Sequence, residues 1–150
     1  MAFILLHREE PQLRTQMAAQ LWPEVAAPEA KANLRRRLHD LKQFIPEGDR
    51  WLQVSPKTVH WVMDVGCDLD VAVLDRLADA PALKAASLAE LEQAARCYRD
   101  NLLPACDAAW IVPHRERFKQ QAIALLDTLI NRLAAADQPE QLSLALDYGQ

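Results

Sequence analysis

The segment from Pro28 to Ile45 constrains the fold of this chain more than any other, because its apolar residues follow a helical period. Those residues are Leu34, Leu38, Leu41 and Ile45. Intervals of three and four positions place them on one stripe of an α-helix, and such a stripe packs against a core. The segment therefore predicts an amphipathic helix over 28–45 whose opposite face is exposed.

The exposed face of this predicted helix is basic, although the whole chain carries a formal net charge of −4. A turn of about 100° per residue places Ala32, Arg36, His39 and Gln43 opposite the leucines. A face of small, amide and basic side chains suits insertion into the major groove of DNA. We expect contacts to base edges from Asn33, Arg36 and His39. Contacts to phosphates, which position a helix without reading sequence, are expected from Lys31, Arg35, Arg37 and Lys42.

The elements on either side of this helix follow the order of a winged helix. A helix over 11–22 comes first, and Trp22-Pro23 ends it because a residue before proline avoids the helical conformation. Residues 51–54 and 58–62 are rich in aromatic and β-branched side chains, so they predict a hairpin that turns at 55–57. Arg50 at the base of this wing and Lys57 at its tip are expected to contact the DNA backbone or the minor groove.

Charge divides the chain into two parts. Residues 1–62 hold 9 Lys and Arg against 7 Asp and Glu, whereas residues 63–150 hold 8 against 14. Such an asymmetry indicates two parts with different partners. The acidic stretch at 64–70 is the predicted joint, so we expect a DNA-binding domain over 1–66 and a second domain over 67–150.

The second part is predicted to be helical almost throughout. We expect a helix over 71–78 that Pro81 stops, and a helix over 87–103 that Ser87 and Glu90 open with a capping box. A long helix follows from 110 or 113 to 136, and a last helix opens at 137–139. Antiparallel helices with short connections favour a helical-repeat architecture. The predicted fold class is therefore mainly α: an incomplete winged helix-turn-helix with a β-hairpin wing, followed by antiparallel helices.

The sequence favours no catalytic, cofactor or metal site. It contains no glycine-rich phosphate loop and no GxSxG or HExxH motif. Cys67, Cys97 and Cys106 have the spacing of neither a zinc site nor a disulfide framework, and a reducing cytoplasm suits them. No apolar run is long enough to span a membrane. We therefore expect a cytoplasmic protein that is not an enzyme.

Five motifs resemble, in order, those of the bacterial transcriptional activators that join an OmpR-type winged helix to a helical BTAD (bacterial transcriptional activation) domain. They are Leu21-Trp22-Pro23, Ala30–Arg36, Asp68-Leu69-Asp70-Val71, Tyr98–Pro104 (YRDNLLP, where the family has YRGDLLP), and Trp110 with Arg115-Glu116-Arg117. The resemblance implies binding to double-stranded DNA by residues 28–45 and the wing. It implies tetratricopeptide-like (TPR-like) helix pairs after residue 70, which would contact RNA polymerase or another regulator.

Both ends of the chain depart from the family pattern. Family members carry an N-terminal β-sheet and a full first helix before the segment that matches Phe3–Arg8, and their helix pairs continue beyond the second. Here the sheet and most of the first helix are missing, and the sequence stops within the second pair. We therefore expect a winged helix that lacks the N-terminal sheet.

Two other hypotheses stay open. One is a helical adaptor or dimerisation module that does not bind DNA, in which the basic helix meets an acidic partner or the chain forms a homodimer. The acidic second half and Trp110 favour this hypothesis. The other is a small helical enzyme with a site at Cys106 and His114.

Overall fold

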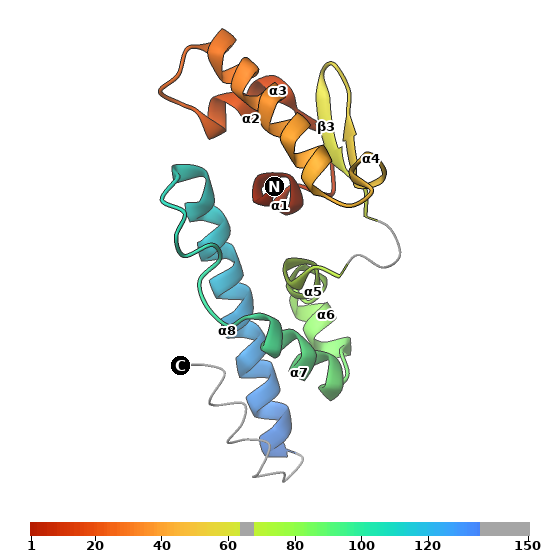
Figure 1. Ribbon diagram of the computed structural model, residues 1–150. Helices are drawn as coiled ribbons and strands as arrows, with labels where there is room; N and C mark the ends of the chain where they lie inside the picture. Colours follow the sequence, from red (N-terminus) through yellow and green to blue (C-terminus); the bar gives the residue numbers. More distant parts are fainter. Residues whose placement is uncertain (64–67, 136–150) are drawn as a thin grey trace. The chain divides into compact units, whose positions relative to one another are not determined.

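The computed structural model describes residues 1–63 and 68–135. Its helices, with one small antiparallel sheet of three strands, make the chain mainly α, as the sequence predicts. The chain divides into two compact units, Met1–Cys67 and Asp68–Gln150 (Figure 1). This division falls one residue after the predicted boundary at 66. The last predicted helix, from 137, and Cys67 lie outside the described residues.

The first unit begins with a short helix and interleaves helices with the strands of the sheet. Its elements are α1 (Ala2–Leu6), β1 (Gln12–Leu13), α2 (Arg14–Leu21), α3 (Ala27–Phe44), α4 (Gly48–Trp51), β2 (Leu52–Val54) and β3 (Thr58–Trp61). The prediction of the helix over 28–45 is confirmed to within one residue at each end. The prediction of a helix from residue 11 is wrong at its start, because residues 12 and 13 pair with β3. Trp51, predicted to lie in the hairpin, belongs to α4.

The sheet has the strand order β1-β3-β2, and both pairings are antiparallel. Val59 lies at the centre of β3, where it pairs with Gln12 on one side and Val54 on the other, and it is fully buried. The helix α3 packs on α2 with Leu34 and Leu38 buried, so the predicted leucine stripe faces the core over its first half. Its second half, at Leu41 and Ile45, is half-buried.

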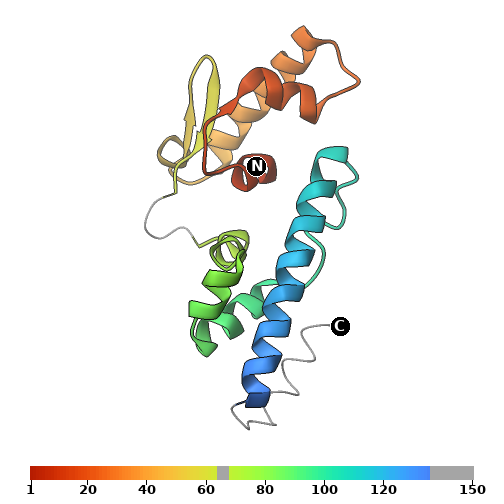
Figure 2. The ribbon, with the colours of Figure 1, turned by 180° about the vertical axis from the view of Figure 1, so that it is seen from behind.

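The hairpin β2–β3 is tied to the start of α2 by hydrogen bonds from one residue. The backbone N–H of Arg14 donates to the carbonyl of Lys57 at 2.9 Å, and its guanidinium Nη1 donates to the carbonyl of Ser55 at 3.0 Å. Ser55 closes the turn itself, because its Oγ accepts from the N–H groups of Thr58 at 2.8 Å and Lys57 at 3.2 Å. The tip of the hairpin is therefore ordered and held beside the helices (Figure 2).

The second unit packs three short helices along one side of a long one (Figures 1 and 2). Its elements are α5 (Asp70–Arg76), α6 (Ala80–Ala85), α7 (Leu88–Cys97), the 3-10 turn η1 (Ala109–Ile111) and α8 (Val112–Ala135). The buried residues of α8 recur at intervals of three and four positions and so form one stripe; they are Phe118, Ala122, Leu125, Leu129 and Leu133. Leu91 and Ile111 complete this core, each with no exposed surface.

The local helix boundaries of the second unit are predicted in part. The capping box of α7 is confirmed: the Oγ of Ser87 accepts from the N–H of Glu90 at 3.3 Å, and Oε2 of Glu90 accepts from the N–H of Ser87 at 2.7 Å. The helix predicted over 71–78 ends at Arg76, before Pro81. Pro81, predicted to stop that helix, lies in the first turn of α6, where its missing N–H costs nothing. The prediction that α7 runs to Leu103 is also wrong, because the helix ends at Cys97.

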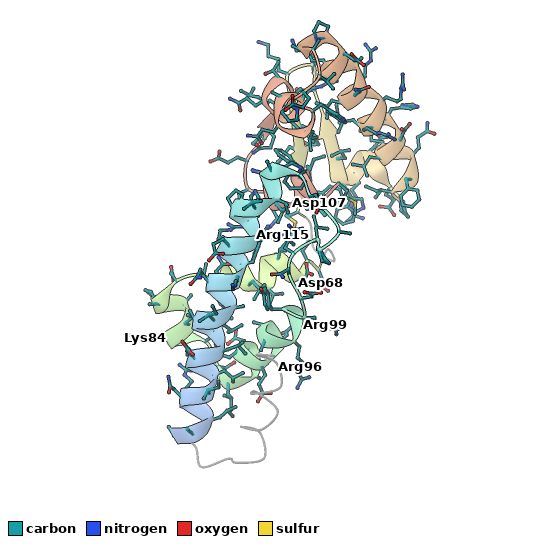
Figure 3. All side chains as sticks on the ribbon, turned by 90° about the vertical axis from the view of Figure 1, so that its left-hand side faces the viewer. Asp68, Lys84, Arg96, Arg99, Asp107 and Arg115 are labelled. Atoms are coloured by element: carbon teal, nitrogen blue, oxygen red, sulfur yellow. The ribbon has the colours of Figure 1, made fainter. Side chains whose placement is uncertain are left out.

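A single arginine of α8 holds the connection that follows α7. The connection over 98–111 turns back on itself, with Leu103 at a positive φ of 49°. The guanidinium of Arg115 donates to the carbonyl oxygens of Leu102 at 2.8 Å, Cys106 at 2.8 Å and Leu103. Figure 3 shows Arg115 at the N-terminal end of α8. These three carbonyls of the connection therefore find charged donors in α8.

Replacing Arg115 by methionine tests this clamp. We expect the Arg115→Met variant to lower the free energy of unfolding by about 2 kcal/mol, because three carbonyls lose a charged donor while the aliphatic stem is kept. Urea unfolding followed by circular dichroism measures the change. The matched control is Arg96→Met, whose exposed ion pair with Glu92 spans 3.9 Å and contributes little. Equal stability of the two variants would contradict the clamp.

Candidate nucleic-acid interface

The surface of α3 that is not buried divides into three sectors around the helix axis. At about 100° per residue, Arg36, His39 and Gln43 point away from the core, and all three are exposed. Lys31 and Arg35 lie on the flank next to the hairpin. Arg37, Asp40 and Phe44 lie on the other flank, roughly opposite to them. Which flank a basic residue occupies decides what it is able to contact.

The outward sector and the hairpin-side flank hold cations without carboxylate partners. Lys31, Arg35 and Arg36 are exposed, and no carboxylate of the described residues lies within ion-pair distance of them. His39 has only Gln43 close by, with 3.4 Å between the two Nε2 atoms. These side chains are therefore available to an anionic partner.

A groove of about 480 Å³ runs between this flank of α3, the start of α2 and the tip of the hairpin. Its lining residues are Arg14, Thr15, Pro28, Lys31, Ala32, Leu34, Arg35 and Pro56. Three cations thus border one groove, and Lys57 stands exposed beside Pro56 in the hairpin turn. The groove has the charge and the accessibility to receive a phosphate group.

Arg14 is the residue of this groove that sequence reasoning missed. It is the first residue of α2, and in the sequence it stands apart from the cluster of basic residues in α3. It joins them only because Leu13 pairs with Thr58, which brings the hairpin tip to the start of α2. A pairing of two residues over that separation leaves no periodic pattern that predicts it.

Three other predicted contact residues already have carboxylate partners. Arg37 Nη1 lies 3.9 Å from Oδ2 of Asp40, and Arg50 Nη1 lies 3.0 Å from Oε2 of Glu47. The Nζ of Lys42 lies 2.6 Å from Oδ1 of Asp49. Asn33, another residue predicted to contact DNA, is half-buried. The structure therefore does not bring Arg37, Lys42 and Arg50 into the groove with Lys31 and Arg35, and their roles on DNA stay predictions.

The pair of Lys42 and Asp49 closes the turn that follows α3. The hydrogen bond from Lys42 and its positive charge lower the pKa of the Asp49 carboxyl below its ordinary value. Gly48 makes this approach possible, because a Cβ there would lie 2.2 Å from the backbone oxygen of Lys42. The guanidinium of Arg50 lies 4.8 Å from the ring centroid of Trp51, so α4 also holds its cation in place.

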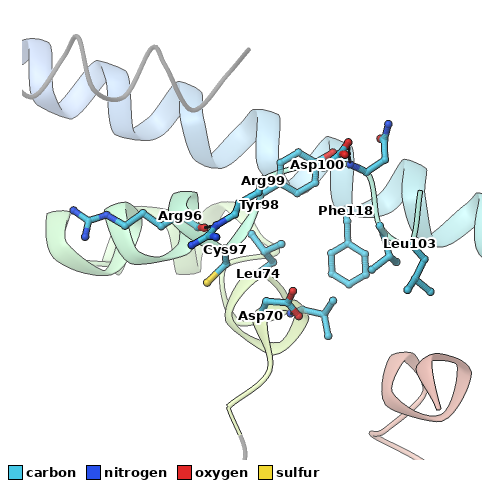
Figure 4. A pocket seen from close by; sticks show the side chains of 12 residues that line it. Asp70, Leu74, Arg96, Cys97, Tyr98, Arg99, Asp100, Leu103 and Phe118 are labelled. Atoms are coloured by element: carbon cyan, nitrogen blue, oxygen red, sulfur yellow. Dashed lines mark hydrogen bonds between the residues drawn. The ribbon is translucent and has the colours of Figure 1, made fainter. Parts of the chain in front are cut away.

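The second unit carries a separate pocket of about 490 Å³ between α5, the end of α7 and α8 (Figure 4). Its lining includes Leu74 and Phe118 as apolar walls, and Asp70 and Arg99 as charged groups. Arg96 belongs to the rim, and in Figure 4 its guanidinium extends away from the pocket.

Burial favours the neutral forms of two ionisable side chains in this pocket. It raises the pKa of the Cys97 thiol, an effect to which the charge of Asp70 adds. Burial, with the charges of Asp100 and Glu116, also raises the pKa of the Tyr98 hydroxyl. A neutral thiol is a weak nucleophile, so the pocket is suited to binding an amphipathic group more than to covalent chemistry.

No family model matches the chain, and neither the curated proteins nor the solved structures contain a significant match.

Within residues 1–63 and 68–135, no group of three His, Cys, Asp or Glu side chains is arranged to hold a metal ion. None of the described helices has both the length and the apolar character needed to cross a membrane. His114 packs the edge of its ring against Trp110, with 6.3 Å between the ring centroids.

Replacing Lys42 by glutamine tests the closure of the turn after α3. In the Lys42→Gln variant we expect the pKa of Asp49 to rise towards its ordinary value, as measured by NMR titration of the carboxyl carbon. Because the folded-state pKa of Asp49 is lowered, its contribution to stability is present above the ordinary carboxyl pKa and is lost as the pH falls through the lowered one. The control Lys57→Gln, in the hairpin turn, should leave the Asp49 titration unchanged. An unshifted Asp49 in Lys42→Gln would contradict the pairing.

Proposed function

We propose that this chain is a DNA-binding transcriptional regulator in which α3 enters the major groove and the hairpin β2–β3 acts as the wing of a winged helix. The observation that supports this proposal best is the groove between α3 and the hairpin tip, where Arg14, Lys31 and Arg35 are exposed or half-exposed beside Lys57. The proposal agrees with the resemblance to the BTAD activators, and it makes the first unit the reader of DNA.

The dimensions and charge of α3 suit this role. A helix with its side chains is about 10–12 Å wide, which matches the major groove at about 12 Å. Residues 1–62 carry more basic than acidic side chains, although the whole chain is acidic. The local field therefore attracts phosphates even where the net charge of the molecule does not.

The residues of the face divide into two roles under this proposal. Arg36 and His39 in the outward sector would contact base edges, because they point away from the core. Four cations, Arg14, Lys31, Arg35 and Lys57, would hold phosphates on the side of the wing. Lys42 and Arg50 would first have to leave Asp49 and Glu47, so they are weaker candidates than their positions in the sequence suggest.

The second unit is proposed to contact RNA polymerase or another regulator. Residues 68–150 hold 13 acidic side chains against 8 basic ones, which disfavours DNA as their partner. The pocket at α5, α7 and α8 offers apolar walls to a side chain of such a protein. Under this proposal the helices are TPR-like pairs, and α7 packs against α8 as such a pair would.

Salt dependence tests the phosphate contacts. Four phosphate contacts predict that the logarithm of the binding constant falls with the logarithm of salt concentration at a slope of about −4. Fluorescence anisotropy measures this slope on a duplex selected from a random library and on an unselected duplex. Arg35→Ala should weaken binding to both duplexes and make the slope shallower by about 1, whereas the control Arg96→Ala should change neither. A flat titration, or no binding to any duplex at low salt, would contradict DNA binding.

Sequence preference tests the outward sector. Arg36→Ala is expected to reduce the ratio of affinities for the selected and unselected duplexes by about tenfold, because one base contact contributes about 1–3 kcal/mol of discrimination. Arg35→Ala should leave this ratio unchanged, so the two variants act as controls for each other. Equal losses on both duplexes in Arg36→Ala would remove its base-reading role and leave the phosphate contacts standing.

A further inference from the structure

The flank of α3 that faces away from the hairpin borders an apolar groove. The groove measures about 480 Å³ and is lined by Met1, Ile4, Met17, Leu21, Trp22, Leu34, Arg37, Leu38, Asp40, Leu41 and Phe44. Phe44 is 86% exposed and Met1 61%, so large apolar side chains meet water at its edge. Contiguous apolar surface of this kind marks an interaction site more often than scattered exposed residues do.

This surface is complementary to itself. It holds a protruding ring, Phe44, and a hollow with apolar walls in the same patch. Its only charged side chains are Arg37 and Asp40, one of each sign, which are 74% and 55% exposed. In a twofold dimer the same patch of each copy forms the interface, so every contact between two different residues occurs twice. Phe44 of each copy would then face the hollow of the other, and Arg37 of each copy would face the other copy's Asp40.

We propose that a second copy of this chain covers the groove, with Phe44 of each copy inserted into the groove of the other. Arg37 of one copy then pairs with Asp40 of its partner, which strengthens an interaction that is only a 3.9 Å contact within one copy. Burying two phenyl rings and both hollows supplies the apolar core of the interface, and the reciprocal ion pairs fix its register.

The proposed dimer interface does not depend on DNA binding. Arg37, Asp40 and Phe44 lie on the flank of α3 opposite to Lys31 and Arg35, so a dimer leaves the cationic groove uncovered. The patch carries one charge of each sign, so it is complementary in charge to itself, which favours a second copy over a partner that presents a single sign of charge.

Sedimentation velocity of the full chain over a concentration series tests the proposal. We expect a reversible dimer that Phe44→Ser weakens at least tenfold in dissociation constant, as expected for an aromatic anchor at an interface. Phe44 is almost fully exposed in one copy, so its replacement should leave the helical circular dichroism unchanged. The matched control is Ile123→Ser, an exposed apolar residue of α8 with 45% exposure, which should leave the dimer intact.

Charge reversal then tests the twofold pairing. Arg37→Asp alone and Asp40→Arg alone should each weaken the dimer, because like charges then face each other across the axis. Mixing the two single variants places opposite charges across the axis in both pairs and should restore association as a heterodimer, a result that misfolding of either single variant could not give. A monomer at all concentrations, a dimer indifferent to Phe44→Ser, or a mixture of the two single variants that does not associate would each overturn the proposal.

Discussion

The rotational setting of α3 on the core of the first unit is the constraint on which the rest of the structure depends. Leu34 and Leu38 are buried on the helix that packs against α2, and removing them from water fixes which side of α3 faces inward. Because successive residues turn by about 100°, a change of one position in this setting would carry Arg36 from the outward sector to a flank. The chemistry of the exposed surface therefore follows from two buried leucines.

Two local devices then give the flanks of α3 different neighbours. The hydrogen bonds of Arg14 to the hairpin turn place a cationic tip beside Lys31 and Arg35. At the far end, Gly48 lets the chain turn against the carbonyl of Lys42, and Asp49 and Glu47 pair with Lys42 and Arg50. One helix thus offers a basic groove on one side and an apolar groove on the other, which is why DNA binding and self-association are proposed as separate, compatible functions.

Short-range patterns predicted much of this fold from the sequence. The spacing of the leucines gave the bounds of α3, and the Ser87–Glu90 capping box gave the start of α7, since both depend on residues close in the chain. The remaining features depend on contacts between distant residues. The strand β1 exists only through its pairing with β3, and the place of Arg14 follows from it. The connection that follows α7 is held by Arg115 of α8, which donates to the carbonyls of Leu102 and Cys106.

The central claim is that the outward sector of α3 and the hairpin tip together form the surface that contacts DNA. Amide NMR spectra of the labelled chain, recorded during titration with a duplex, test it most directly because they report every backbone position at once. The account predicts that the largest shifts fall on residues 31–39 and 55–58, with Arg14 among them. Shifts confined to the second unit or to the flank of Arg37 and Phe44, or spectra that do not change, would contradict it.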